Sequence, residues 1–215
     1  MNFDSVPLDQ RYFYKHPKTK EEHYANSIYV SDKYLKTLFG ELKKRDYLKN
    51  SIVVILGDHS WPVGEHGKYH NESGPYNEFY RTDALFLWPN KLSKKIVKFP
   101  TSQLDIAPTI LDLLNIERNK DFMGYSVLNE IKNRPIYQIQ PYSGVYLGVI
   151  KWPYKFVKHL STKATYLYDL EKDEQEQENL SFSQKKQSII KEFELQIKYI
   201  VEHQYKIERN IKTKK

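Results

Sequence analysis

The 215-residue chain contains no cysteine. This absence excludes disulfides, zinc sites built from cysteine and a nucleophile made from cysteine within these residues. No stretch reaches the roughly 18 to 20 apolar residues of a membrane span, and the first residues lack the basic-then-apolar pattern of a signal peptide. The sequence therefore shows no transmembrane segment and leaves the localisation of this chain open.

Motifs for nucleic acid and nucleotide binding are also missing. The chain has neither a zinc-finger pattern nor an aromatic-glycine RNA signature, and it has no phosphate-binding Gly-rich loop or nucleophile-elbow motif. Much of the net charge of +7 comes from the last ten residues, which are typical of a solvated tail: Lys206, Arg209, Lys212, Lys214 and Lys215. We therefore predict no nucleic-acid partner.

The first half of the chain has the pattern of an α/β protein. Apolar residues recur every three to four positions over residues 21–45, which predicts an amphipathic helix. Residues 51–56 show no polar alternation, as in a parallel strand covered on both faces, and residues 84–88 predict a second buried strand near them. Residues 102–116 predict a capped helix with Asp105 in its first turn, and Pro108 should tilt that helix or divide its first turn from the rest.

The second half changes character. Four short antiparallel strands are predicted at residues 136–140, 146–150, 154–158 and 166–170, followed by a helix over residues 184–206 with one apolar side. Asp169 and the acidic run at residues 171–178 are predicted to form a turn and solvated surface. We divide the chain into residues 1–130, part of a catalytic domain, and residues 131–215, a small β subdomain with a closing helix.

Asp58 and His59 follow directly after the first predicted strand. The crevice beyond strand ends is where open α/β sheets bind ligands, because loops there present side chains without disturbing the sheet. One carboxylate oxygen and one imidazole nitrogen suit zinc and related cations. The alternative interpretation is a capped loop after a core strand.

Four motifs in order resemble one enzyme family. They are Gly57-Asp58-His59, the Gly-Glu-His-Gly-Lys loop of residues 64–68, the helix of residues 102–116, and residues 152–180. Together they resemble the sulfatase-like hydrolases and transferases of the alkaline phosphatase superfamily, which include arylsulfatases, lipoteichoic acid synthases and phosphoethanolamine transferases. The implied fold is the C-terminal part of an alkaline-phosphatase-like sandwich, with a mainly parallel sheet and flanking helices, plus a small antiparallel β subdomain and a C-terminal helix.

The resemblance implies a divalent metal ion (Ca, Zn, Mn or Mg) bound by Asp58 and His59. Lys68 and His70 would contact the oxygens of a sulfate or phosphate ester, with His66 as a competitor and Glu65 as a carboxylate that orients a histidine. Each of these loop residues has an alternative as an exposed side chain without a ligand, which we favour for Glu65. Asp105 is assigned to capping and packing. Ser60 stands where the family usually has a glycine.

In the family, the nucleophile and another acidic metal ligand lie upstream of the region matched here. We therefore expect this chain to represent a C-terminal part of a sulfate-ester hydrolase whose intact parent is membrane-anchored or extracytoplasmic. One alternative is a phosphoglycerol or phosphoethanolamine transferase of the same superfamily. Another is a non-catalytic product or subunit that needs an N-terminal half-domain as its partner.

Overall fold

The computed structural model describes residues 13–70, 74–141 and 144–212. The chain divides into two compact units, Met1–Asn71 with Glu78–Lys95, and Glu72–Asn77 with Ile96–Lys215. No helix in the described residues is long and apolar enough to cross a membrane. The side chains of residues 204–215 lie outside the described set, so the solvated tail stays a prediction. The division of the chain at residue 130 also stays a prediction.

The first unit begins with the predicted amphipathic helix, α1 (Lys20–Lys44). Thr19 caps it: the Thr19 hydroxyl accepts from the Glu22 amide at 3.1 Å, and the Glu22 carboxylate accepts from the Thr19 amide at 3.2 Å. This reciprocal pair satisfies two donors that the first helical turn leaves without partners. Acids in the first turn and lysines in the last turn complement the helix dipole.

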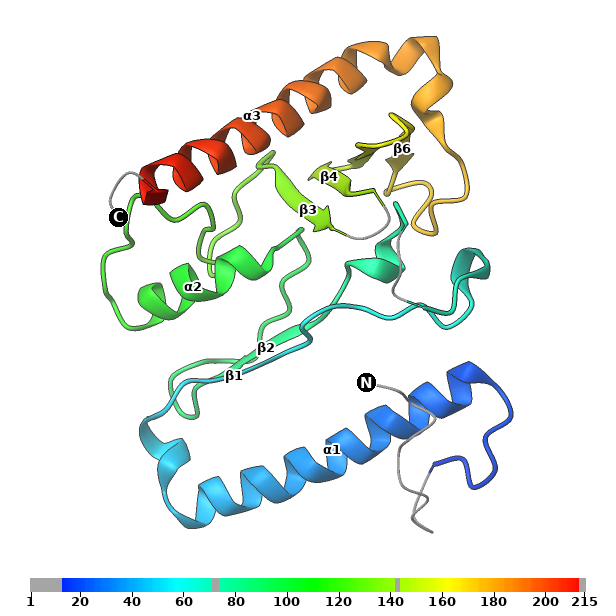
Figure 1. Ribbon diagram of the computed structural model, residues 1–215. Coiled ribbons are helices and arrows are strands. Elements are labelled where there is room, and N and C mark those ends of the chain that lie inside the picture. The colour runs from blue at the N-terminus through cyan, green and yellow to red at the C-terminus, as the bar shows by residue number, and fades with distance from the viewer. Residues whose placement is uncertain (1–12, 71–73, 142–143, 213–215) are drawn as a thin grey trace. The chain divides into compact units, whose positions relative to one another are not determined.

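Both predicted strands of this unit are present and neighbour each other (Figure 1). β1 (Val53–Leu56) pairs with β2 (Ala84–Leu87), with Val53 opposite Leu87. The prediction that β1 is a parallel strand covered on both faces is wrong. β2 runs antiparallel to it, and Leu56 is 41% exposed. An unbroken apolar run indicates a strand but does not encode the direction of its neighbour.

In the second unit, Ser102 caps a 3₁₀ turn (Gln103–Asp105) that continues as α2 (Ile106–Leu113). This change of helix type separates the first turn from the rest, as predicted. Pro108 is the third residue of α2, where a backbone N–H would have no acceptor within the helix. The proline is therefore accommodated without the loss of a helical hydrogen bond.

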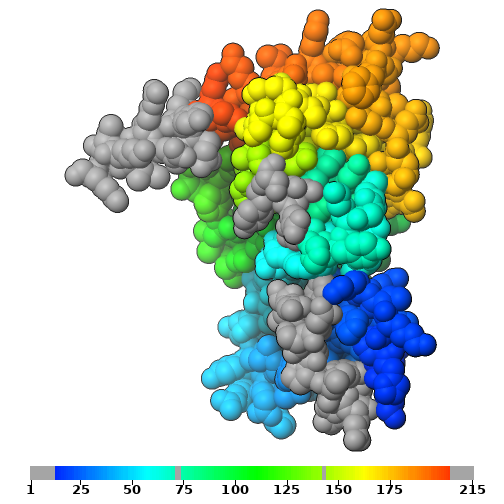
Figure 2. All heavy atoms as spheres, turned by 45° about the vertical axis from the view of Figure 1, so that its right-hand side comes forward, coloured from blue at the N-terminus to red at the C-terminus, as the bar shows by residue number. Residues whose placement is uncertain are grey.

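The four short strands form one antiparallel sheet in chain order. They are β3 (Ile136–Gln140), β4 (Tyr146–Lys151), β5 (Tyr154–His159) and β6 (Thr165–Asp169), and each bound agrees with the sequence prediction to within one residue. The segment after β6, orange in Figure 2, lies against the strands, and Asn179 in it accepts from the Leu167 amide at 3.0 Å. This contact holds the segment on the edge of the sheet.

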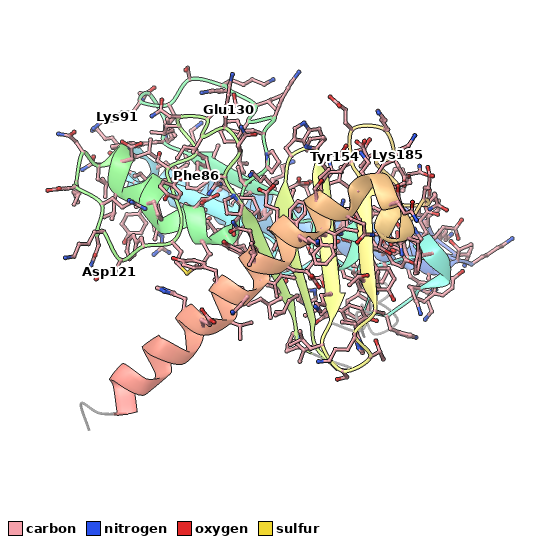
Figure 3. All side chains as sticks on the ribbon, turned by 90° about the horizontal axis from the view of Figure 1, so that it is seen from above. Phe86, Lys91, Asp121, Glu130, Tyr154 and Lys185 are labelled. Carbon is pink, nitrogen blue, oxygen red and sulfur yellow. The ribbon has the colours of Figure 1, made fainter. Side chains whose placement is uncertain are left out.

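The core of the second unit lies between this sheet and the closing helix, α3 (Gln187–Lys212). Figure 3, the view from above, shows α3 crossing over the strands. Its apolar side packs on the sheet, and the Phe156 and Phe193 rings stack with centroids 5.8 Å apart. Burying each such side chain contributes roughly 1.5–3 kcal/mol. The helix and its apolar side were predicted from the sequence.

Replacing Phe193 with Ala should destabilise the second unit by about 3–5 kcal/mol, because the ring is 3% exposed and its removal leaves a cavity against Phe156. Urea unfolding followed by circular dichroism measures the change. Leu195→Ala, on the same helix but 65% exposed, is the matched control and should have little effect. Equal losses in the two variants would show that α3 does not pack in this way.

Candidate functional site

Gly57 determines how the chain leaves β1. Its N–H donates to the Asp83 carbonyl at 3.3 Å, so the strand pairing continues to this residue. A Cβ atom at position 57 would lie 2.1 Å from the Thr82 hydroxyl oxygen, which only glycine avoids. Asp58 and His59 are thereby presented at the end of β1, where the sequence predicted them.

The donor atoms of Asp58 and His59 lie close together. His59 Nε2 is 3.6 Å from Asp58 Oδ2, and the two side chains are 46% and 90% exposed. His59 Nδ1 is 2.8 Å from the Ser60 carbonyl oxygen. Because a carbonyl only accepts, Nδ1 is the donor in this contact, so Nε2 is the ring nitrogen available to a cation beside the carboxylate.

This geometry fits two ligands of one cation. Two ligands bound about 2.0–2.4 Å from a metal ion at tetrahedral or octahedral angles lie about 3–4 Å apart. A protein metal site usually needs three or four ligands, however, and no group of three or more His, Asp or Glu side chains gathers among the described residues. The pair therefore fits as part of a metal site and not as a complete one.

The loop after this pair is held by a buried carboxylate. His66 has a left-handed backbone with φ 48°, and its Nδ1 lies 2.7 Å from Glu78 Oε1, with both side chains largely buried. Histidine tolerates this conformation better than bulky residues do, and the contact with Glu78 fixes its ring. Glu65 is instead exposed and accepts from the Val63 amide at 2.7 Å, in agreement with the interpretation favoured from the sequence.

Lys68 and His70 follow this loop directly, and both are exposed. The Lys68 amide donates to the Glu65 carbonyl at 2.9 Å, which closes the short 3₁₀ turn of residues 65–67. The ammonium and imidazole groups are thus accessible to an anion from solvent. Their contact with a substrate stays a prediction.

A buried ion pair that the sequence did not reveal lies in the second unit. The side chains of Lys155 and Glu176 are 0% and 1% exposed, with Lys155 Nζ 2.6 Å from Glu176 Oε1. Asn77 completes the group. Its backbone N–H donates to Glu176 Oε2 at 2.5 Å, and its side-chain Oδ1 accepts from Lys155 Nζ at 2.9 Å. The three residues come from distant parts of the sequence. Their contacts attach the segment that contains Asn77 to β5.

The prediction that the acidic run is solvated surface is therefore wrong for Glu176, whose side chain is buried. Glu176 has φ 56°, a left-handed turn that directs its carboxylate inward, and Asp169 is also buried. Tyr168 lies beside this group, with its ring centroid 6.1 Å from that of Tyr76. Burial, together with Tyr76 and Glu176, raises the pKa of Tyr168, so its hydroxyl stays protonated.

Asp105 has the capping and packing role predicted for it. Its buried carboxylate accepts from the Ser102 amide at 2.7 Å and the Tyr125 amide at 2.9 Å, and Arg134 binds both of its oxygens. These bonds connect the start of α2 to the segment before β3. All are structural, and Asp105 is satisfied without a ligand.

Solved structures similar to this chain have the alkaline-phosphatase-like fold of sulfatases. The protein BT4656, solved in complex with its substrate D-glucosamine-2-N,6-O-disulfate, aligns with a TM-score of 0.66 and 21% identity over 86% of this chain and 40% of that chain. A phosphonate monoester hydrolase from Silicibacter pomeroyi aligns with a TM-score of 0.67 and 17% identity over 82% of this chain and 40% of that chain. The predicted fold class is confirmed.

The family follows from the sequence matches. The Sulfatase family profile matches residues 7–116, slightly more than half of the chain, and the profile of the N-sulphoglucosamine sulphohydrolase C-terminal region matches residues 64–203. The chain therefore belongs to the sulfatase family. A Delta 4,5-hexuronate-2-O-sulfatase of Bacteroides thetaiotaomicron is 28% identical over 195 residues, which cover 83% of this chain and 40% of that protein. The chain thus spans less than half the length of this relative.

Replacing Lys155 with Met should destabilise the second unit by about 3–5 kcal/mol, because it leaves the Glu176 carboxylate buried without its cation. The double variant Lys155→Met/Glu176→Leu should lose much less than the sum of the single changes. Denaturant unfolding of the four proteins measures this coupling. The more exposed pair Lys158 and Glu194, 2.7 Å apart, provides a control cycle with an expected coupling below about 1 kcal/mol. Equal coupling in the two cycles would contradict the buried role of Lys155.

Proposed function

We propose that this chain forms part of a sulfate-ester hydrolase in which Asp58 and His59 bind a divalent cation. The observation that carries the proposal is the 3.6 Å separation of Asp58 Oδ2 and His59 Nε2 at the end of β1, in a chain of the sulfatase family. The division into a catalytic part, residues 1–130, and a subdomain, residues 131–215, is part of the same proposal.

Each site residue has a distinct part in this mechanism. The bound cation would polarise an oxygen of the ester. Asp58 would supply negative charge to hold that cation, and the Nδ1–Ser60 contact would leave Nε2 of His59 as its ligand atom. Lys68 donates charge-assisted hydrogen bonds to sulfate oxygens, and His70 donates to another oxygen of the same group. Together they compensate the charge of the group that is transferred.

Sulfated sugars are the substrate class that the comparisons favour. The relative from Bacteroides thetaiotaomicron is named for a hexuronate 2-O-sulfate, and the BT4656 structure contains a disulfated glucosamine. Both names specify sulfate groups on a sugar. We propose a sugar sulfate as the substrate of the enzyme to which this chain contributes.

Two alternatives rest on specific observations. The similarity to a phosphonate monoester hydrolase favours phosphorus chemistry, including a phosphoryl-group transferase, because one fold supports several reactions. The exposed Leu56 and Leu85 side chains of β1 and β2 favour a subunit that pairs with an N-terminal half-domain. In that case the catalytic residues would be divided between two chains.

Calorimetric titration of the chain with Ca²⁺, Mn²⁺ and Zn²⁺ tests the proposed metal pair. We expect saturable binding of at least one ion, which the variant Asp58→Ala/His59→Ala should lose, because two of its ligands are removed. Asp121→Ala/His203→Ala makes the same chemical change in the second unit and should retain the binding. Binding that persists unchanged in Asp58→Ala/His59→Ala would refute the assignment.

A further inference from the structure

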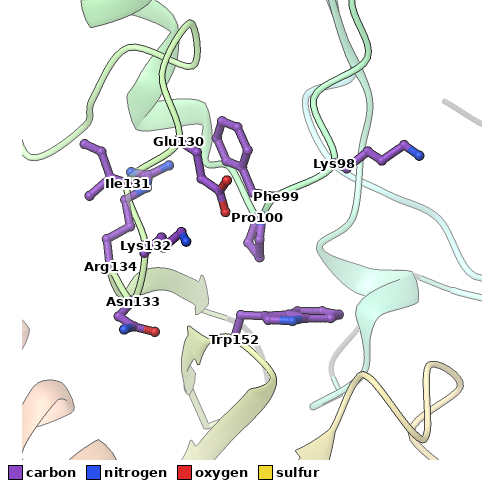
Figure 4. A pocket seen from close by; sticks show the side chains of 9 residues that line it. All are labelled: Lys98, Phe99, Pro100, Glu130, Ile131, Lys132, Asn133, Arg134 and Trp152. Atoms are coloured by element: carbon purple, nitrogen blue, oxygen red, sulfur yellow. The ribbon is translucent and has the colours of Figure 1, made fainter.

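A pocket of about 400 Å³ lies wholly within the second unit (Figure 4). It is bounded by residues 98–100, residues 130–134 and the turn between β4 and β5. Small-molecule pockets in proteins have volumes of roughly 300–1,000 Å³. None of the residues assigned to the proposed active site lines it, so its function has to be inferred from its own side chains.

Trp152 provides an aromatic surface in this pocket. The residue is 48% exposed, and Figure 4 shows its indole ring lying below Pro100 with one face toward the pocket. The face of an indole carries partial negative charge, which attracts the partially positive C–H groups on the apolar face of a sugar ring. A flat ligand with one apolar face and a polar edge is therefore suited to this position.

Charged side chains lie on the opposite side of the pocket. Figure 4 shows the Lys132 ammonium group directed into it and the Glu130 carboxylate beside Pro100. Among the residues that the structure describes, neither Lys132 nor Glu130 has an ion pair or hydrogen-bond partner. Arg134, in contrast, is fully engaged by Asp105. The pocket thus offers a cation for an anionic group and a carboxylate for hydroxyl donors.

We propose that this pocket binds an anionic pyranose, one unit of an acidic oligosaccharide. The sugar ring stacks on Trp152, its hydroxyls donate to Glu130, and its sulfate or carboxylate group binds Lys132. Lys98, at the rim, adds a second positive charge for the neighbouring unit. The site belongs to the second unit alone and does not depend on metal binding by Asp58 and His59.

The test uses two acidic tetrasaccharides whose anions differ. Hyaluronan tetrasaccharide carries only carboxylates, and keratan sulfate tetrasaccharide carries only sulfates. Each is titrated calorimetrically into the Asp58→Ala/His59→Ala chain, so that the proposed metal site does not contribute. We expect Trp152→Ala in this background to weaken binding about tenfold and Lys132→Gln about threefold.

Two matched variants control for general surface effects. Phe182→Ala removes another exposed aromatic ring of the second unit, and Lys191→Gln removes a lysine on the exposed side of α3. Both should bind like the parent. Thermal unfolding checks that each variant is folded. If Trp152→Ala does not fold, Lys132→Gln still tests the site.

Each outcome decides the proposal. Binding of either tetrasaccharide that weakens in both pocket variants supports it, and the preferred tetrasaccharide shows whether the anion is a carboxylate or a sulfate. Absence of binding, or binding that Trp152→Ala and Lys132→Gln leave unchanged, would overturn it. Equal binding of neutral cellotetraose would overturn the requirement for an anion and thus the proposal as stated.

Discussion

The buried ion pair between Lys155 and Glu176 is the interaction on which the arrangement of the second unit depends. Removing two charges from water costs several kcal/mol per ion, and only good geometry with further hydrogen bonds offsets this. Asn77 supplies those bonds to both partners. An ion pair of this kind specifies one arrangement more than it adds stability, because any other position of Glu176 leaves the Lys155 ammonium buried without a counter-charge. It therefore determines where the acidic segment and Asn77 attach to β5.

The next residue in the chain, Glu78, holds His66 in the first unit. Two consecutive residues thus anchor two separate features, Asn77 on the sheet and Glu78 on the loop that leads to Lys68 and His70. The profile of the sulphohydrolase C-terminal region matches residues 64–203, so it includes both the loop and the sheet. We infer that Glu78, through His66, fixes the loop that leads to Lys68 and His70, whose contact with a substrate stays a prediction.

Much of this structure could be predicted because its signals are local. The strands β3 to β6 are short segments rich in β-branched and aromatic residues and separated by turn residues, and Ser102 and Asp105 form a capping pair three residues apart. Asp58 and His59 could be predicted as a pair since they are adjacent. The antiparallel pairing of β1 with β2 could not be predicted, because the residues of β1 do not encode the direction of the neighbouring strand. Glu176 could not either: it is one of several acids in its run, and only a left-handed turn and a lysine 21 positions earlier distinguish it.

The central claim is that Asp58 and His59 bind one cation together at the end of β1. Anomalous diffraction from crystals grown with Mn²⁺ tests this most directly, because it locates the ion without reference to activity. The account predicts an anomalous peak about 2.0–2.4 Å from both Asp58 Oδ2 and His59 Nε2, with Nδ1 still on the Ser60 carbonyl. A peak bound elsewhere, with these two atoms contacting only solvent, would contradict it.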